Sequence, residues 1–186
     1  MDITNHWRYF LSLESEFNNS LRYVEYTKEQ ESVFSFEFAR LLMLICSEMD
    51  VLFKVICDHI DNTANADSIG KYYGVISTKY DITSEKIIID RYGLKLFPFK
   101  DWKQDTPPLW WTAYNKVKHR RHEHFCQANL GNVLQAIAGL FILNLIALNE
   151  YSLISKIFDH PSLLDRDVSP GALMSETSYK VKLVTP

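Results

Sequence analysis

The sequence lacks the features that mark secreted, disulfide-rich and membrane-spanning proteins. Its N-terminal residues contain no basic stretch followed by an apolar one, so no secretory signal is expected. The most apolar run, 133–148, is interrupted by Gln135 and Asn144, which makes it too short and too polar for a comfortable membrane span. The cysteines are few, widely spaced and without a CxxC pair: Cys46, Cys57 and Cys126. These absences favour reduced thiols in a cytoplasmic protein with no membrane segment.

The chain also lacks a strong net charge and a di-iron ligand pattern, and both absences exclude classes of function. The formal net charge is −3, so the chain as a whole is not a general binder of polyanions, and any nucleic-acid contact must use a local basic patch. No Glu-x-x-His pattern occurs, which excludes the ligand pattern of di-iron helical bundles. We therefore expect neither a cofactor nor a metal site. Metal binding is a lesser alternative, because four possible ligands are at helical spacing: His119, His122, Glu123 and Cys126.

What the sequence does contain is enough apolar residues for one core. Hydrophobic residues make up 47% of 186 positions, with no internal repeat and no low-complexity segment. Their recurrence at helical spacing predicts a mainly α fold, a helical bundle. A β-branched run before Gly93 predicts a small β-hairpin or extended insertion near 86–98. We expect a single helical domain over 1–160, a loosely structured C-terminal arm over 161–186, and helices at 6–27, 28–61, 69–80, 108–128 and 130–149.

The segment 110–124 carries most of the unusual chemistry. It combines two tryptophans and a tyrosine with three histidines, and it contains four cations with no acid among them: Lys116, Lys118, Arg120 and Arg121. On a helix, one side would collect an aromatic, an amide, a cation and two imidazoles: Trp111, Asn115, Lys118, His119 and His122. An imidazole can transfer protons near neutral pH, and a lysine can hold a phosphate as a point charge. The pattern therefore predicts a site for phosphate or RNA.

This segment resembles the motif of HEPN domains, helical bundles that are widespread in prokaryotic toxin–antitoxin and phage-defence systems. Their motif is an arginine, usually followed by a polar residue, with a histidine four residues beyond that polar residue. Asn115 occupies the polar position and His119 the histidine position, whereas Tyr114 stands where the family has arginine. The longer pattern around the motif is also similar to a HEPN-like family of bacterial proteins, and the resemblance spans residues 30–150.

The resemblance implies a homodimeric, metal-independent endoribonuclease whose two motifs meet across a dimer cleft. It assigns catalysis to His119, as activator of the ribose 2′-hydroxyl, together with Asn115 and Tyr114. Contacts to RNA or phosphate fall to the neighbouring polar residues: Lys116, Lys118, Arg120, Arg121 and His122. Supporting roles fall to three further residues: Arg40, Glu48 and Trp111. A role in defence or in a toxin–antitoxin pair is implied as well, with an antitoxin or another protein as a partner.

Tyr114 leaves two outcomes open, because a phenol lacks the two-pronged cationic grip of a guanidinium. Either Arg40, Arg120 or Arg121 supplies the charge from elsewhere, or the protein binds RNA, a nucleotide or a protein without catalysis. A third alternative is that the cations form only a solvated helix face. The charged residues of the predicted long helix likewise indicate either surface ion pairs or a network that supports the basic helix: Glu37, Arg40 and Glu48.

Overall fold

The computed structural model describes residues 2–156 and 159–166, and its centre is a pair of long helices, α2 (Phe36–Ile60) and α5 (Leu130–Glu150). Each helix begins at a polar side chain that satisfies a free backbone donor. Ser35 Oγ accepts from the Phe38 amide at 3.0 Å, and Asn129 Oδ1 accepts from the Asn132 amide at 2.9 Å. The predicted mainly α bundle is confirmed.

Helix α5 forms the axis of the core because it is apolar on every side, and all of its residues from 136 to 148 are buried. Gly139 lies near the middle of this helix. A Cβ atom at this position would lie 3.0 Å from Met49 Cε, 3.2 Å from Phe99 Cζ and 3.4 Å from Trp110 Cζ2. The glycine therefore lets three neighbouring segments pack directly on the helix backbone.

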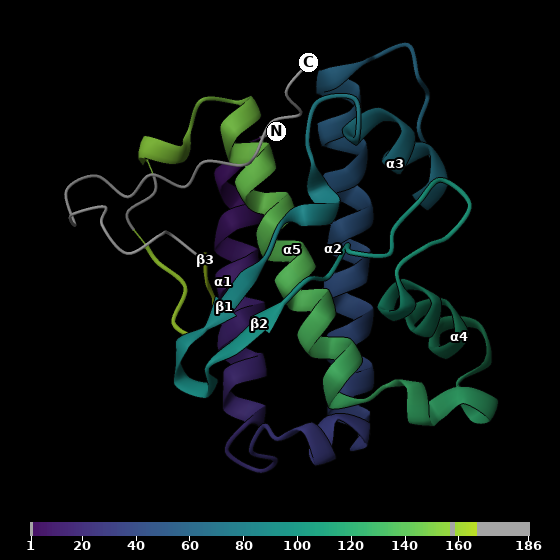
Figure 1. Cartoon of the computed structure of the whole chain (residues 1–186), viewed down its shortest axis with the longest axis vertical. Coiled ribbons are helices and arrows are strands. Elements are labelled where there is room, and N and C mark those ends of the chain that lie inside the picture. The colour runs from purple at the N-terminus through teal and green to yellow at the C-terminus, as the bar shows by residue number, and fades with distance from the viewer. Residues whose placement is uncertain (1, 157–158, 167–186) are drawn as a thin grey trace.

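The remaining helices surround this pair. In Figure 1, α1 (Thr4–Ser20) lies to one side of α5, and α3 (Ile69–Ile76) and α4 (Leu109–His124) lie beyond α2 on the other side. In the part of the chain that the structure describes, five short 3-10 helices fill the connections: Lys28–Ser32, Ile82–Ser84, Asp90–Tyr92, Phe125–Gln127 and Ile154–Lys156. The central helices therefore separate α1 from α4, so polar residues of α1 lie far from those of α4.

Within the described residues, one helix, α5, is long and apolar enough to cross a membrane. Most of its apolar window, 83%, is buried inside the bundle. The core helix of a soluble protein passes the same test of length and composition, so this helix is weak evidence for a membrane span.

A small sheet covers part of the α1 and α5 side. Strands β1 (Ile87–Ile89) and β2 (Leu94–Leu96) form the antiparallel hairpin that the sequence predicts near 86–98, with Ile88 opposite Lys95. A third strand, β3 (Asp165–Arg166), pairs antiparallel with β1 on its other edge. The hairpin therefore receives a strand from a part of the chain far along the sequence.

The segment before β3 is fastened to α1 by one buried carboxylate. Glu14 accepts hydrogen bonds from three successive backbone amides, Ser162 at 2.9 Å, Leu163 at 2.7 Å and Leu164 at 3.0 Å. The side chains of Leu163 and Leu164 are buried. The first residues of the predicted arm thus pack on the bundle, whereas the prediction for 167–186 lies outside the described residues.

Two helix boundaries differ from the sequence prediction. The first helix ends at Ser20, not near residue 27, and the second begins at Phe36, not at residue 28. Thr27 makes no side-chain cap bond, and the residues that follow it form a 3-10 helix. Ser35 provides the working cap and so fixes the later start.

Candidate nucleic-acid interface on helix α4

Helix α4 is held in place by its aromatic residues. Trp110 Nε1 donates a buried hydrogen bond of 2.7 Å to the carbonyl oxygen of Pro98. The Trp111 ring is edge-on to Phe53 of α2, with ring centroids 6.1 Å apart. These contacts anchor the first two turns of α4 against the bundle and leave its later turns to face solvent.

Tyr114 belongs to the anchored side of the helix. Its exposed fraction is 5%, and its ring centroid lies 5.3 Å from that of Trp111. The Lys118 ammonium nitrogen sits 5.4 Å from the centre of the Tyr114 ring and covers it from the solvent side. At the position where HEPN domains have an arginine, this chain therefore has a packed aromatic ring under a lysine.

The other two residues predicted to act in catalysis lie farther out. His119 is exposed, and Asn115, one turn before it, is half-buried. Lys116 and Lys118 are exposed beside them. The structure therefore presents an imidazole, an amide and two cations from one stretch of helix, and it keeps Tyr114 below them.

A break in the helix changes the expected geometry after His119. Arg120 has φ −143° and ψ 52°, which lie outside the helical region and mark a kink. The regular spacing that places His122 on the face of His119 does not extend across this kink. His122 Nε2 lies 3.2 Å from Glu123 Oε1, and the shared face of the two histidines stays a prediction.

Glu123 gathers the charged groups beyond the kink. Its carboxylate lies 3.7 Å from Arg120 Nη1 and 3.9 Å from His124 Nε2, in addition to its contact with His122. Arg121 is exposed and, within the described part of the chain, forms no ion pair. One acid is therefore shared among several cationic or titratable groups, and the end of α4 keeps a positive balance.

Two residues expected to support this site lie elsewhere. Arg40 of α2 bonds Glu16 of α1 and also Glu37, one turn earlier on its own helix. These bonds raise the pKa of the arginine further above its ordinary value. Glu48 contacts the buried His6 of α1. Because α1 and α4 lie on opposite sides of α2, neither residue joins the basic helix. Arg40 forms the surface ion pairs that were one of the two alternatives.

An exposed aromatic group, which no local pattern in the sequence indicates, lies next to the kinked end of α4. The backbones of Val33 and Ser35 bond those of Leu130 and Ala128, which brings two distant connections together. Three rings meet there, with centroids 4.7 Å apart for one pair and 5.2 Å for another: Phe36–Phe125 and Phe34–Phe125. Phe36 is 74% exposed and Phe34 is 48% exposed. We call these three residues the phenylalanine platform.

A second group missed by the sequence analysis lies at the far end of α5. The Glu150 carboxylate, whose side chain is 1% exposed, contacts Lys79 Nζ at 2.7 Å and His59 Nε2 at 3.7 Å. It also accepts a hydrogen bond from Tyr80, whose pKa is raised by burial and by this bond. The acceptors and donors satisfy one another, so we interpret this group as structural.

The alternative of a metal site is not supported by the geometry. Among residues 2–156 and 159–166, no three histidine, cysteine or acidic side chains are grouped as metal ligands would be. The set proposed from helical spacing includes positions on both sides of the Arg120 kink, and the kink breaks the spacing that would bring them together.

Comparisons with known proteins add no relative. No protein-family model, curated protein or solved structure matches this chain. The HEPN resemblance therefore rests on the sequence alone.

Proposed function

We propose that this protein binds single-stranded RNA along the outer side of α4, with phosphates on its cations and bases on the phenylalanine platform. The observation that carries the proposal is the adjacency of these two surfaces at one end of the helix. Phe125 directly follows the cationic stretch 116–124, and it contacts both exposed phenylalanines. Exposed aromatic rings beside a basic groove are the usual means of holding unpaired nucleotides.

Charge supports the same assignment. The chain carries a net charge of −3, yet four exposed cations lie between residues 116 and 121. Within the described residues, Lys116, Lys118 and Arg121 form no ion pair, so their charges are available to a polyanion. A merely solvated helix face gives no reason for the neighbouring phenylalanines to remain exposed.

The binding experiment compares RNA forms and matched variants. We expect a fluorescent single-stranded RNA to bind more tightly than the same RNA annealed to its complement. Lys118→Gln with Arg121→Gln should weaken binding and reduce the salt slope by about 1.4, since each phosphate contact to a single strand contributes about 0.7. The control is Lys28→Gln with Lys95→Gln, which removes two exposed cations away from α4. Equal effects of both pairs would refute the assignment.

A second set of variants tests whether bases stack on the phenylalanine platform. Phe36→Ala should weaken binding to single-stranded RNA by about 5- to 150-fold, because stacking contributes about 1–3 kcal/mol per base. Binding to duplex RNA should change little. Tyr23→Ala, which removes another highly exposed aromatic ring on a different loop, is the control. Unchanged binding by Phe36→Ala would remove the stacking part of the proposal.

Metal-independent endoribonuclease activity is the second candidate function, and the exposure of His119 with Asn115 one turn before it favours it. RNA incubated with the protein in EDTA should then be cut, and His119→Ala should reduce the rate by about 10²–10⁴-fold. His122→Ala is the control, since the kink separates this histidine from His119. An equal loss in both variants would contradict the assignment.

Dimerisation belongs to the catalytic candidate, because two motifs would have to share one cleft. We expect a homodimer in sedimentation experiments, with α4 at its interface. A monomer at high concentration would leave RNA binding intact as a proposal and would count against cleavage of the HEPN type. Binding to an antitoxin or other protein through the same face is the rival class, and it should depend far less on salt than RNA binding does.

A further inference from the structure

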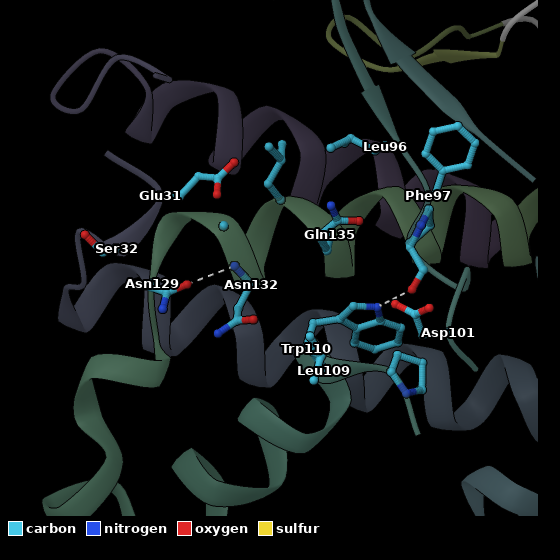
Figure 2. A pocket seen from close by; sticks show the side chains of 14 residues that line it. Glu31, Ser32, Leu96, Phe97, Asp101, Leu109, Trp110, Asn129, Asn132 and Gln135 are labelled. Atoms are coloured by element: carbon cyan, nitrogen blue, oxygen red, sulfur yellow. Dashed lines mark hydrogen bonds between the residues drawn. The ribbon is translucent and has the colours of Figure 1, made fainter. Parts of the chain in front are cut away.

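A cavity of about 430 Å³ lies between the 3-10 helix 28–32, the end of the hairpin, and the first turns of α4 and α5. Figure 2 shows it with Glu31 and Asp101 on opposite sides of Gln135, and with Trp110 close to Gln135. This volume falls within the range of small-molecule sites, which is about 300–1,000 Å³. The cavity does not include the exposed cations of α4.

The cavity combines an apolar surface with two carboxylates and no basic side chain. Its apolar part includes Leu109, which is 79% exposed, and the partly exposed ring of Phe97. Its charged residues are Glu31 and Asp101, and no lysine, arginine or histidine lines it. A site of this composition repels phosphates and carboxylates and attracts cations.

Glu31 is held in position from two directions. Gly131 at the start of α5 lets the helix approach closely, since a Cβ there would lie 3.3 Å from Glu31 Cβ. The Tyr26 hydroxyl donates to Glu31 Oε1 at 2.6 Å. Burial, together with this bond, raises the pKa of Tyr26 to about 12, so the phenol keeps its proton and continues to donate near neutral pH.

Gln135 provides an acceptor without a donor. Its Oε1 atom is buried and has no hydrogen-bond partner within the described residues. A buried acceptor without a partner costs free energy, and a ligand that brings an N–H group can recover it. The cavity thus offers a neutral amide between two carboxylates, next to the indole of Trp110.

We propose that this cavity binds a small organic cation with an apolar body, such as an arylalkylamine. The ammonium group would lie near Gln135 Oε1, attracted by the carboxylates of Glu31 and Asp101 on either side of it, and the apolar body would pack against Leu109, Phe97 and Trp110. The inference does not depend on RNA binding, because the two sites have opposite charge and share no residue.

The experiment uses two ligands that share a ring and differ in charge. Isothermal titration of the full-length protein should show binding of tryptamine, and no binding of indole-3-propionate at the same concentrations. Phenethylamine tests whether the indole ring itself is needed. The proposal is wrong if neither amine binds at millimolar concentration, or if the acid binds as well as the amine.

Matched variants locate the site. Asp101→Asn and Glu31→Gln should each weaken tryptamine binding by about 10- to 100-fold, the range expected for loss of a charge-assisted hydrogen bond. Asp105→Asn is the control, because this exposed acid lies in the same loop and does not line the cavity. Thermal unfolding of each variant shows that it remains folded. If Asp105→Asn weakens binding as much as Asp101→Asn does, general charge attraction explains the result and the site is refuted.

Discussion

The two halves of α4 differ in how deeply their side chains are buried. In 109–117 the helix buries two tryptophans, Tyr114 and Val117 against the bundle. In 118–124 almost every side chain is exposed, and the helix is interrupted at Arg120. We call these the inner half and the outer half.

The difference shows how packing divides one continuous motif. Tyr114 lies in the inner half, where its ring is covered by Trp111 and Lys118, whereas His119 lies in the outer half. Burial, as well as the chemistry of the phenol, therefore decides what a substitution of Tyr114 does. The inner half should respond to substitution mainly through stability, and the outer half mainly through binding.

The largest effect is expected for Tyr114→Arg. A guanidinium in this buried position would lack a partner and would lie near the Lys118 ammonium, so the free energy of unfolding should fall by about 3–5 kcal/mol. Chemical denaturation of the variant and the parent measures this. Tyr114→Phe keeps the packed ring and should change stability by less than about 1 kcal/mol.

The same variant also tests the nuclease interpretation. A Tyr114→Arg protein that stays folded and gains RNA cleavage in EDTA would mean that the site retains a phosphate-shaped cleft. In that case the buried position of Tyr114 would not prevent a guanidinium from reaching substrate. A folded variant that binds RNA as the parent does and cleaves nothing would favour the binding-only alternative.

The next effect is expected where α5 receives the inner half. Gly139→Val would force side-chain atoms into Met49, Phe99 and Trp110, and overpacking of this kind destabilises by about 1–3 kcal/mol. Thermal unfolding checks the shift. Gly74→Ala is the control, since no atom lies within 4 Å of a Cβ at that helical position. That control should leave the protein as stable or stabilise it by about 0.5–1 kcal/mol.

A surface charge that has partners provides the third test. Arg40→Gln removes the bonds to Glu16 and Glu37, and such exposed pairs contribute about 0.2–1 kcal/mol. The arginine lowers the pKa of Glu37 below its ordinary value of 4.5. This contribution is therefore present above pH 4.5 and is lost as the pH falls through the folded-state pKa.

The measurement is the difference in unfolding free energy between the parent and Arg40→Gln across an acid titration. That difference should shrink as the pH is lowered below 4.5. Arg22→Gln, at an exposed arginine of the α1–α2 connection, is the control and should show no such dependence. A difference that grows in acid would mean that Glu37 is not the group responsible.

The smallest effect on stability is expected in the outer half. Arg121→Gln should change the free energy of unfolding by no more than about 0.5 kcal/mol, because this side chain is exposed and takes no part in packing. Denaturation curves check this alongside RNA binding. A loss above 1 kcal/mol would show that the outer half supports the fold, and it would weaken the case that its charges serve a ligand.

Helical spacing was sufficient to predict the main elements. The apolar residues of α5 cover its whole circumference, and the β-branched run ending before Gly93 forms the expected hairpin. The helix starts were harder to predict, because Thr27 and Ser35 both offer a cap and only the tertiary contacts select Ser35. Local patterns are therefore a better guide to the type of each element than to the residue at which it begins.

The candidate site was predicted less completely, for reasons that are not local. Neither a proline nor a glycine marks the kink at Arg120. The sequence therefore did not show that the regular helical spacing ends there. Arg40 bonds Glu16, which is 24 positions away in the sequence, so no local pattern indicates this pair. The phenylalanine platform depends on the bridge between Phe34 and Asn129, which only the folded chain creates.

The carboxylate of Glu14 has a consequence for the order in which the chain can acquire its structure. Its backbone donors belong to residues 162–164, and Trp7 of the same helix donates to the carbonyl oxygen of Asp159. During synthesis α1 leaves the ribosome well before these partners, because residues 162–164 follow Glu14 by 148 to 150 positions. A nascent chain halted at residue 160 should therefore leave Glu14 facing water, and the amides of α1 should exchange hydrogen faster than in a chain that includes residues 162–164.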